Sequence, residues 1–239
     1  MAVVAFISIS TTNMGHGLYK SYFNVSYGEE KSRKMDIFVP YSAKKNETNG
    51  VLLYIHGGSW TGGDKIEWVG DSMRAARNGY IAATMNYTLQ SPDNDVTAFD
   101  MVEEIKTAVQ KLKDFSDEQG LNITKLATTG YSAGAHLSAL YAYTVADESP
   151  IELVFTANRV TPSDFHPESW DDVYQKGTAL NIASNLSGTK ITEEMLADGS
   201  AEAIIRSVSP AMLINENSVP SLFGFGGRDT TVPHGMPKQ

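Results

Sequence analysis

The chain has 239 residues, of which 41% are hydrophobic and 20% charged, a composition typical of a globular protein with one large α/β domain or two small ones. Its formal net charge of -9 argues against nucleic acid or an anionic membrane surface as a partner, because both require clustered Lys and Arg. The chain contains no cysteine, which excludes disulfides, thiolate metal sites and a cysteine nucleophile.

The first ten residues, MAVVAFISIS, are apolar but carry no basic residue before the apolar run. They make a poor signal peptide and are too short to span a membrane. We therefore expect a cytoplasmic protein, with secretion left open as the alternative.

Strand and helix patterns then alternate along the chain. In chain order, we expect a strand over 33–40, a strand over 51–56, a helix over 68–79, a strand over 80–87, a helix over 98–120, a strand over 125–130, a helix over 133–145, a strand over 151–157 and a strand over 219–227. Gly79 is expected to end the first helix, because a left-handed cap favours glycine. Residues 160–208, here called the insert, break the alternation with a polar, partly helical segment.

This alternation predicts an α/β fold: a mainly parallel, doubly wound sheet with helices on both faces, built as one domain over 1–239. The insert would form a partial cap or lid within that domain. Ligands in such sheets bind at the carboxyl ends of the strands, so the loops containing HGG, GYSAG and GGRDTTVP become the candidate site.

GYSAG (130–134) matches G-x-S-x-G between an expected strand and an expected helix. In that pattern the serine occupies a strained turn that lifts its hydroxyl above the sheet, and only small neighbours permit the close approach of strand and helix. The helix start also directs free N–H groups toward charge that develops on a substrate oxygen. The alternative is a tight turn that serves packing alone.

HGGSW (56–60) follows the apolar strand 51–55, where a second set of oxyanion donors is needed. Gly57 and Gly58 allow backbone N–H groups to turn inward without a side chain in the way. A glycine-rich loop without function is the alternative, which the order and spacing of the two loops disfavour.

Together the segments YIHGGSWTGGDK, NYTL, GYSAGAHL, SPA and GGRDTTVP resemble the α/β-hydrolases of the HGG carboxylesterase type, over roughly residues 20–239. The resemblance is to small bacterial esterases, including acetyl and feruloyl esterases, and to kynurenine formamidases. The family more often has Asn-Tyr-Arg-Leu where this chain has NYTL.

The resemblance implies that Ser132 is the nucleophile and Asp229 the catalytic acid. It implies an oxyanion hole formed by the N–H groups of Gly57, Gly58 and Ala133. A carboxylate at the end of a buried strand also suits a site loop, although Asp229 could instead be an ordinary turn or N-cap residue.

The catalytic base is missing from this pattern. The fold orders its triad as Ser, acid, His, and His234 alone follows Asp229. His234 lies too close to the acid to match the family, so we expect a chain that stops before its final strand, helix and base. The resemblance implies that His56 is held in the oxyanion loop and does not titrate during the reaction. We expect His136 to be a core histidine and His166 to lie on the surface or in the wall of a pocket.

Trp60, Phe165 and Trp170 are candidates for binding the acyl or aryl group of a substrate, although aromatic residues in such segments more often pack locally. No His/Asp cluster has metal-ligand spacing and no glycine-rich loop suits phosphate, so we expect no metal and no cofactor. An unfinished sheet would also expose the segment SLFGFG as an edge and favour homo-oligomers.

We therefore predict a serine carboxylesterase that hydrolyses small acyl esters through an acyl-enzyme, in a chain that lacks its catalytic histidine. An arylformamidase resembling kynurenine formamidase is the alternative enzyme. A non-catalytic protein of the hydrolase fold that binds a ligand or partner is the alternative from another class.

Overall fold

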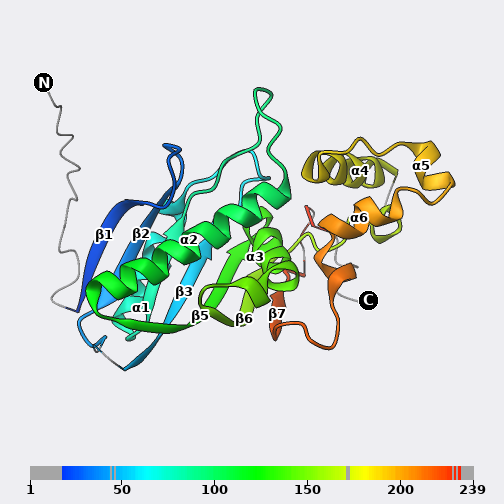
Figure 1. The fold of residues 1–239 in the computed structure, drawn as a ribbon. Coiled ribbons are helices and arrows are strands. Elements are labelled where there is room, and N and C mark those ends of the chain that lie inside the picture. Colours follow the sequence, from blue (N-terminus) through cyan, green and yellow to red (C-terminus); the bar gives the residue numbers. More distant parts are fainter. Residues whose placement is uncertain are drawn as a thin grey trace, which may run out of the picture.

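A computed structural model of the chain describes residues 18–43, 45, 47–170, 173–227, 229, 231 and 232. Within these residues seven strands form one sheet in the order β1-β2-β4-β3-β5-β6-β7 (Figure 1). The strands are β1 (Tyr19–Ser26), β2 (Lys34–Pro40), β3 (Thr48–Ile55), β4 (Ile81–Met85), β5 (Asn122–Tyr131), β6 (Glu152–Arg159) and β7 (Ser221–Gly224). In this order, each pair of neighbouring strands from β4 through β3, β5 and β6 to β7 is parallel. Strand β2 is antiparallel to both of its neighbours, β1 and β4. The expected mainly parallel sheet is confirmed.

The α-helices are α1 (Val69–Arg77), α2 (Ala98–Gln119), α3 (Ala133–Thr144), α4 (Val173–Ser187), α5 (Glu193–Ala197) and α6 (Glu202–Val208). Short 3-10 turns are η1 (Lys65–Trp68), η2 (Ala146–Glu148), η3 (Pro167–Ser169) and η4 (Pro210–Leu213). Helices α2 and α3 cover one face of the sheet, and α1 lies on the other (Figure 1). The expected doubly wound arrangement is therefore present.

The helix ends follow from local sequence. Thr97 and Asp100 form a capping box at the start of α2, in which each side chain accepts a hydrogen bond from the other residue's backbone N–H. Gly120 ends α2 with a φ of 66°, and Gly79 follows α1 with a φ of 91°. These left-handed positions explain why glycine stands there, as the sequence predicts for Gly79.

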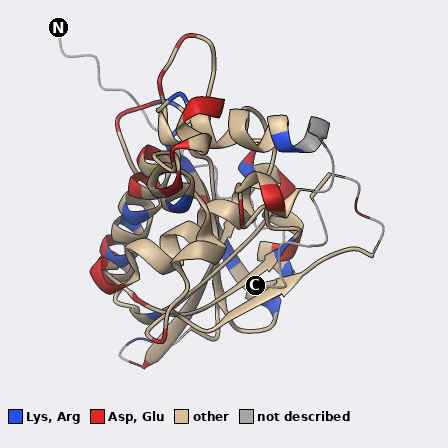
Figure 2. Cartoon of the chain, turned by 90° about the vertical axis from the view of Figure 1, so that its right-hand side faces the viewer, with Lys and Arg blue, Asp and Glu red and all other residues tan. Residues whose placement is uncertain are grey.

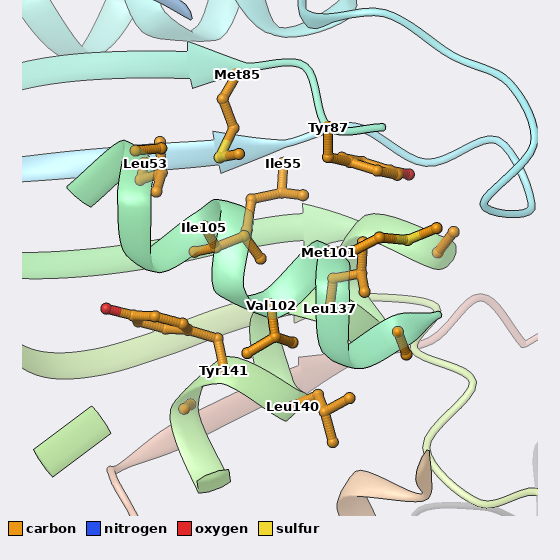
Figure 3. Packing of buried hydrophobic residues seen from close by; sticks show 14 of the residues in the cluster. Leu53, Ile55, Met85, Tyr87, Met101, Val102, Ile105, Leu137, Leu140 and Tyr141 are labelled. Carbon is orange, nitrogen blue, oxygen red and sulfur yellow. The ribbon is translucent and has the colours of Figure 1, made fainter. Parts of the chain in front are cut away.

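The main core lies between the sheet and the helices α2 and α3 (Figure 3). Leu53 and Ile55 of β3 point toward Met101 and Ile105 of α2, and all four are fully buried. The 3.6-residue period of α2 places its apolar side chains on this one face. This packing fixes the carboxyl end of β3, where residues 56–63, here called the glycine loop, begin.

A second, smaller cluster on the opposite face contains Phe38, Trp68, Ala75 and Ala76. Strand β2 is consequently buried on both faces, with Ile37 in the main core and Phe38 in this cluster. The sequence analysis predicted this strand but not the burial of both its faces. It also missed β1, which pairs with β2 at the edge of the sheet.

The insert contributes η3 and the helices α4, α5 and α6, which lie beyond the β7 side of the sheet (Figure 1). Its first residues return to the core, since Phe165 is fully buried and Trp170 nearly so. Within the part of the chain that the structure describes, strand β7 occupies the other edge of the sheet and pairs with β6 alone. Leu222 in β7 is 68% exposed and Phe155 in β6 is 41% exposed, so this end of the sheet presents apolar side chains.

Charged residues are distributed over the surface. On the side seen in Figure 2, Lys and Arg positions lie among Asp and Glu positions, and pairs such as Lys113–Asp117 and Lys125–Glu152 form ion pairs of 2.6 and 2.5 Å. In the part of the chain that the structure describes, no helix combines the length and the apolar character needed to cross a bilayer. Nor do the described residues bring three or more His, Asp or Glu side chains together as metal ligands.

Candidate active site

Ser132 lies at a sharp turn between β5 and α3, at the carboxyl edge of the sheet. Its backbone has a φ of 50° and a ψ of -123°, a left-handed conformation that side-chain-bearing residues seldom adopt. The side chain does not cap α3, and its hydroxyl makes no hydrogen bond within the described residues. The backbone therefore holds a free hydroxyl at the helix start, which is the arrangement of a nucleophile elbow.

The two glycines of the motif allow this turn for steric reasons. A Cβ on Gly130 would lie 2.4 Å from the carbonyl carbon of Gly134, and a Cβ on Gly134 would lie 2.2 Å from the carbonyl oxygen of Ile55. Real Cβ atoms do not approach backbone so closely. The glycines thus let α3 start directly against the end of β3, which brings Ser132 next to the glycine loop.

The glycine loop is held by its own histidine. The His56 ring lies 1% exposed, stacks on Tyr87 with ring centroids 4.4 Å apart, and places Nδ1 2.7 Å from the Gly57 carbonyl oxygen. A carbonyl oxygen only accepts, so Nδ1 carries the proton and donates. Burial lowers the pKa of His56, and its Nε2 is buried without a partner among the described residues. These contacts agree with the expected holding role of His56.

The predicted oxyanion donors differ in their surroundings. The N–H of Gly57 faces the hydroxyl of Tyr131, without a hydrogen bond of ordinary geometry between them. The N–H groups of Gly58 and Ala133 donate to no acceptor within the described part of the chain. This favours Gly58 and Ala133 as the donors that remain free for a substrate oxygen, and their role, like that of Gly57, stays a prediction.

His136 is a core histidine, as the sequence indicated. Its ring is fully buried, its Nδ1 accepts the indole N–H of Trp60 at 3.2 Å, and its Nε2 lies 2.8 Å from the carbonyl oxygen of Val208. Burial lowers its pKa to about 4. Both nitrogens are satisfied by the neutral ring, so His136 has no free nitrogen for a proton from Ser132.

The predicted substrate-binding aromatics pack around that histidine. Trp60 and Phe165 each make an edge-on contact with the His136 ring, and Trp170 stacks on Phe165 with centroids 6.3 Å apart. Trp60 and Trp170 are each 5% exposed and Phe165 is fully buried. This burial supports the alternative of local packing, and a part in substrate binding remains a prediction for all three.

Asp229 is partly buried and stabilises its own turn. Its Oδ1 accepts the backbone N–H groups of Thr231 and Val232 at 2.8 and 3.0 Å, which is the turn role considered as the alternative. Its Oδ2 accepts no hydrogen bond within the described residues. One carboxylate oxygen therefore remains for orienting a base, so the two roles are compatible.

The described histidines do not supply a partner for Ser132. The His166 Nδ1 accepts the N–H of Glu168 at 3.3 Å, and its Nε2 lies 3.9 Å from a Glu202 carboxylate oxygen in the insert. His166 is partly exposed, as expected of a surface residue. His234, the candidate downstream of the acid, lies outside the described residues.

A pocket of about 570 Å³ opens at the carboxyl ends of β5, β6 and β7. It is lined by Tyr131, Arg159, Val160, Gly224, Phe225 and Gly226. A larger groove of about 1250 Å³ lies between the loop Gln90–Thr97 and α4, and reaches the glycine loop only at Thr61. Ser132 lines neither of these two cavities, but Tyr131, which directly precedes it, lines the smaller one.

The sequence did not predict a set of polar contacts around Asp64 and Lys65, next to the glycine loop. Asn86 accepts the N–H of Lys65 at 2.6 Å and donates to Asp64 at 2.9 Å, while the Lys65 ammonium lies 2.8 Å from buried Asp36. Asp64 and Lys65 directly follow the loop, within the quoted segment YIHGGSWTGGDK. The motif could have directed attention to these residues, but their partners are distant in sequence.

Known proteins of similar sequence include esterases and kynurenine formamidases. The chain is 29% identical over 130 residues to a kynurenine formamidase of Salmo salar, covering 54% of this chain and 41% of that protein. It is 25% identical over 226 residues to esterase LipC of Mycobacterium tuberculosis, covering 91% of this chain and 53% of LipC. The chain thus spans about half the length of these curated relatives.

Solved structures share the fold. Esterase B from Lactobacillus rhamnosis superposes with a TM-score of 0.67 at 20% identity, covering 86% of this chain and 65% of that chain. The BD-FAE family model matches residues 35–238, which include the glycine loop, the elbow and Asp229. The chain is therefore a member of the BD-FAE family and has the α/β-hydrolase fold.

Proposed function

We propose that this domain hydrolyses small carboxylic esters through an acyl-enzyme on Ser132. The observation that carries the proposal is the strained elbow, which holds a serine hydroxyl without a hydrogen bond at the start of α3, next to the N–H of Ala133. Donors fixed around the position of a developing oxyanion are the largest contribution in many acyl-transfer enzymes. Esterases among the relatives support the same reaction class.

In the proposed reaction the Ser132 oxygen attacks the ester carbonyl carbon while its proton passes to a base. The carbonyl oxygen becomes an oxyanion that Gly58 and Ala133 stabilise, and its collapse expels the alcohol, which takes up the proton. Water then attacks the acyl-enzyme in the same way and releases the carboxylic acid. We assign the base to an imidazole oriented by Asp229, outside the three described histidines.

The test is hydrolysis of p-nitrophenyl acetate by this chain and by Ser132→Ala. A complete site gives a turnover of at least about 1 per second that disappears in the variant. A chain without its base gives far less, because the serine remains protonated, and a phosphonate ester then labels Ser132 only slowly, at a rate still above the background in Ser132→Ala. Equal rates and no labelling of Ser132 would refute the proposal and support a non-catalytic binding protein.

A second candidate is an arylformamidase, favoured by the similarity to kynurenine formamidase. The same nucleophile and oxyanion donors would cleave a formamide C–N bond instead of an ester C–O bond. Comparing hydrolysis of N-formylkynurenine with that of p-nitrophenyl acetate separates the candidates. A kcat/KM at least tenfold higher on the formamide, roughly 1.4 kcal/mol of transition-state binding, would favour the second.

We also propose that the chain forms homo-oligomers through β7. This strand contains no charged residue or proline, exposes Leu222 and, among the described strands, pairs only with β6. Such an edge favours pairing with another chain. Light scattering tests this, with Leu222→Lys expected to shift the mass toward the monomer. A monomeric wild type at all concentrations would refute it.

A cytoplasmic location is the last proposal, supported by the cysteine-free composition, since disulfides mark oxidising compartments. Fractionation of the source cells with an antibody against the chain tests this location. Recovery of the chain outside the cytoplasm would refute it.

A further inference from the structure

The Tyr131 side chain connects the nucleophile elbow to the glycine loop. Its hydroxyl donates to a carboxylate oxygen of Glu67 and faces the backbone N–H of Gly57. The ring also lies against Gly57, since a Cβ on that glycine would be 2.5 Å from Cε2 of Tyr131. A residue adjacent to the nucleophile thus contacts the opposite wall of the site.

Two consecutive peptide planes of the glycine loop are fixed by these side chains. In the first plane, Tyr87 donates to the His56 carbonyl oxygen at 3.1 Å, and the ring of Tyr131 packs against Gly57. In the second plane, the His56 Nδ1 donates to the Gly57 carbonyl oxygen at 2.7 Å. Carbonyl and N–H point in opposite directions across a trans peptide. Holding the Gly57 carbonyl therefore sets the direction of the Gly58 N–H.

Glu67 is itself fixed in place. Its Oε1 accepts the N–H of Asp64 at 3.2 Å in the capping box of η1, which leaves Oε2 for Tyr131. The next residue, Trp68, donates its indole N–H to the Ile55 carbonyl oxygen at 3.0 Å. These bonds attach η1 to the end of β3, so Glu67 offers Tyr131 a stationary acceptor although its side chain is exposed.

We propose that Tyr131 and Glu67 are positioning residues that orient the Gly57–Gly58 peptide for oxyanion binding. The inference rests on the proposed function, because it assigns these residues a role in that reaction. Neither residue touches the reacting atoms; they act through the glycine loop. Burial, together with the bond to Glu67, raises the pKa of Tyr131 to about 12, so the hydroxyl remains a donor throughout the working range of an esterase.

The experiment compares Tyr131→Phe, Glu67→Ala, Glu67→Gln and the double variant Tyr131→Phe/Glu67→Ala, in the 239-residue chain. For each, kcat and KM for p-nitrophenyl acetate are measured, together with the rate at which a fluorophosphonate labels Ser132. We expect Tyr131→Phe and Glu67→Ala to lower kcat and the labelling rate about tenfold, the effect of one charge-assisted hydrogen bond, with KM nearly unchanged. In the double variant, kcat and the labelling rate should be no lower than in either single variant, because both substitutions break the same connected set of contacts.

Glu67→Gln provides the rescue, since its amide oxygen still accepts from Tyr131; its rates should stay within about threefold of wild type. Tyr22→Phe is the matched control. It removes a phenol that donates to Gln119 at 3.1 Å on the edge strand β1, and should leave both rates unchanged.

The outcomes separate this inference from the proposed function. A wild type whose Ser132 is neither labelled nor required for hydrolysis refutes the function and, with it, the inference. If Ser132 is labelled at equal rates in all variants, the proposed function stands but the inference about Tyr131 and Glu67 is overturned. If the double variant lowers kcat and the labelling rate about a hundredfold, Tyr131 and Glu67 act independently, and this result would also overturn the inference.

Discussion

Trp60 donates its indole N–H to the Nδ1 of His136 at 3.2 Å, which joins the glycine loop to the helix that follows the nucleophile. His136 is also bonded to Val208 at the end of α6, so one buried ring connects the loop, α3 and the insert. Phe165 packs on both rings. The walls of the candidate site are therefore held together by neutral hydrogen bonds and aromatic contacts below the site.

His136 should make stability depend on pH. Its pKa is about 4 in the folded chain, because burial disfavours the charged ring, and near 6.5 when unfolded. The stabilising contribution is fully present above pH 6.5 and is lost as pH falls from 6.5 through 4, by about 3 kcal/mol at pH 4.

Urea denaturation of the wild type and of His136→Gln between pH 7.5 and 4 measures this effect. Glutamine keeps one donor and one acceptor but does not titrate, so its stability should decrease less with falling pH. His56 is present in both proteins, and the difference between the curves therefore isolates His136. Parallel curves would contradict the expectation.

Gly134→Ala should destabilise the fold. The added methyl group would meet the backbone oxygens of Ile55 and His56 at 2.2 and 2.4 Å, and backbone cannot move aside as a flexible side chain can. We expect a loss of about 3 kcal/mol, at the upper end for overpacking. The matched control is Gly177→Ala in α4, where nothing lies within 4 Å of the new Cβ. Thermal denaturation should show the control equal to or slightly above wild type.

Removing either member of the Asp36–Lys65 pair should be costly. The Lys65 ammonium lies 2.8 Å from Asp36, and their side chains are 11% and 3% exposed. Asp36→Ala should cost about 3 kcal/mol because it leaves a nearly buried ammonium without its partner. The double variant Asp36→Ala/Lys65→Met should cost less than the sum of the single variants in urea denaturation. Additive costs would show that the pair does not interact.

Ser132→Gly should be more stable than Ser132→Ala. Both variants lose the hydroxyl, but only glycine adopts a φ of 50° with a ψ of -123° without steric strain. We expect the free energies of unfolding to differ by about 1 kcal/mol. This difference is the backbone strain that alanine suffers in the elbow, minus the larger conformational entropy that glycine loses on folding. Differential scanning calorimetry measures it, and an Ala variant as stable as the Gly variant would indicate an unstrained turn.

Local sequence was sufficient where neighbouring residues decide the structure. The glycines of GYSAG, the capping box at Thr97 and the apolar period of α2 each act within a few residues, so the elbow and its flanking elements could be predicted. The alternation of strands and helices likewise predicted the parallel sheet. In contrast β1, with the sequence YKSYFNVS, has a polar and interrupted pattern. It is a strand because its neighbour β2 offers an edge to pair with.

The sequence by itself determined the fold class, the place of Ser132 and the position of the glycine loop beside it, because these follow from backbone sterics and hydrophobic periodicity. Only the tertiary structure decided that Tyr131 packs on Gly57 and bonds to Glu67, that Phe165 and Trp170 are buried, and that Asp36 meets Lys65. These contacts join residues up to 74 positions apart, and no local pattern encodes which distant side chain a buried donor or ring will meet.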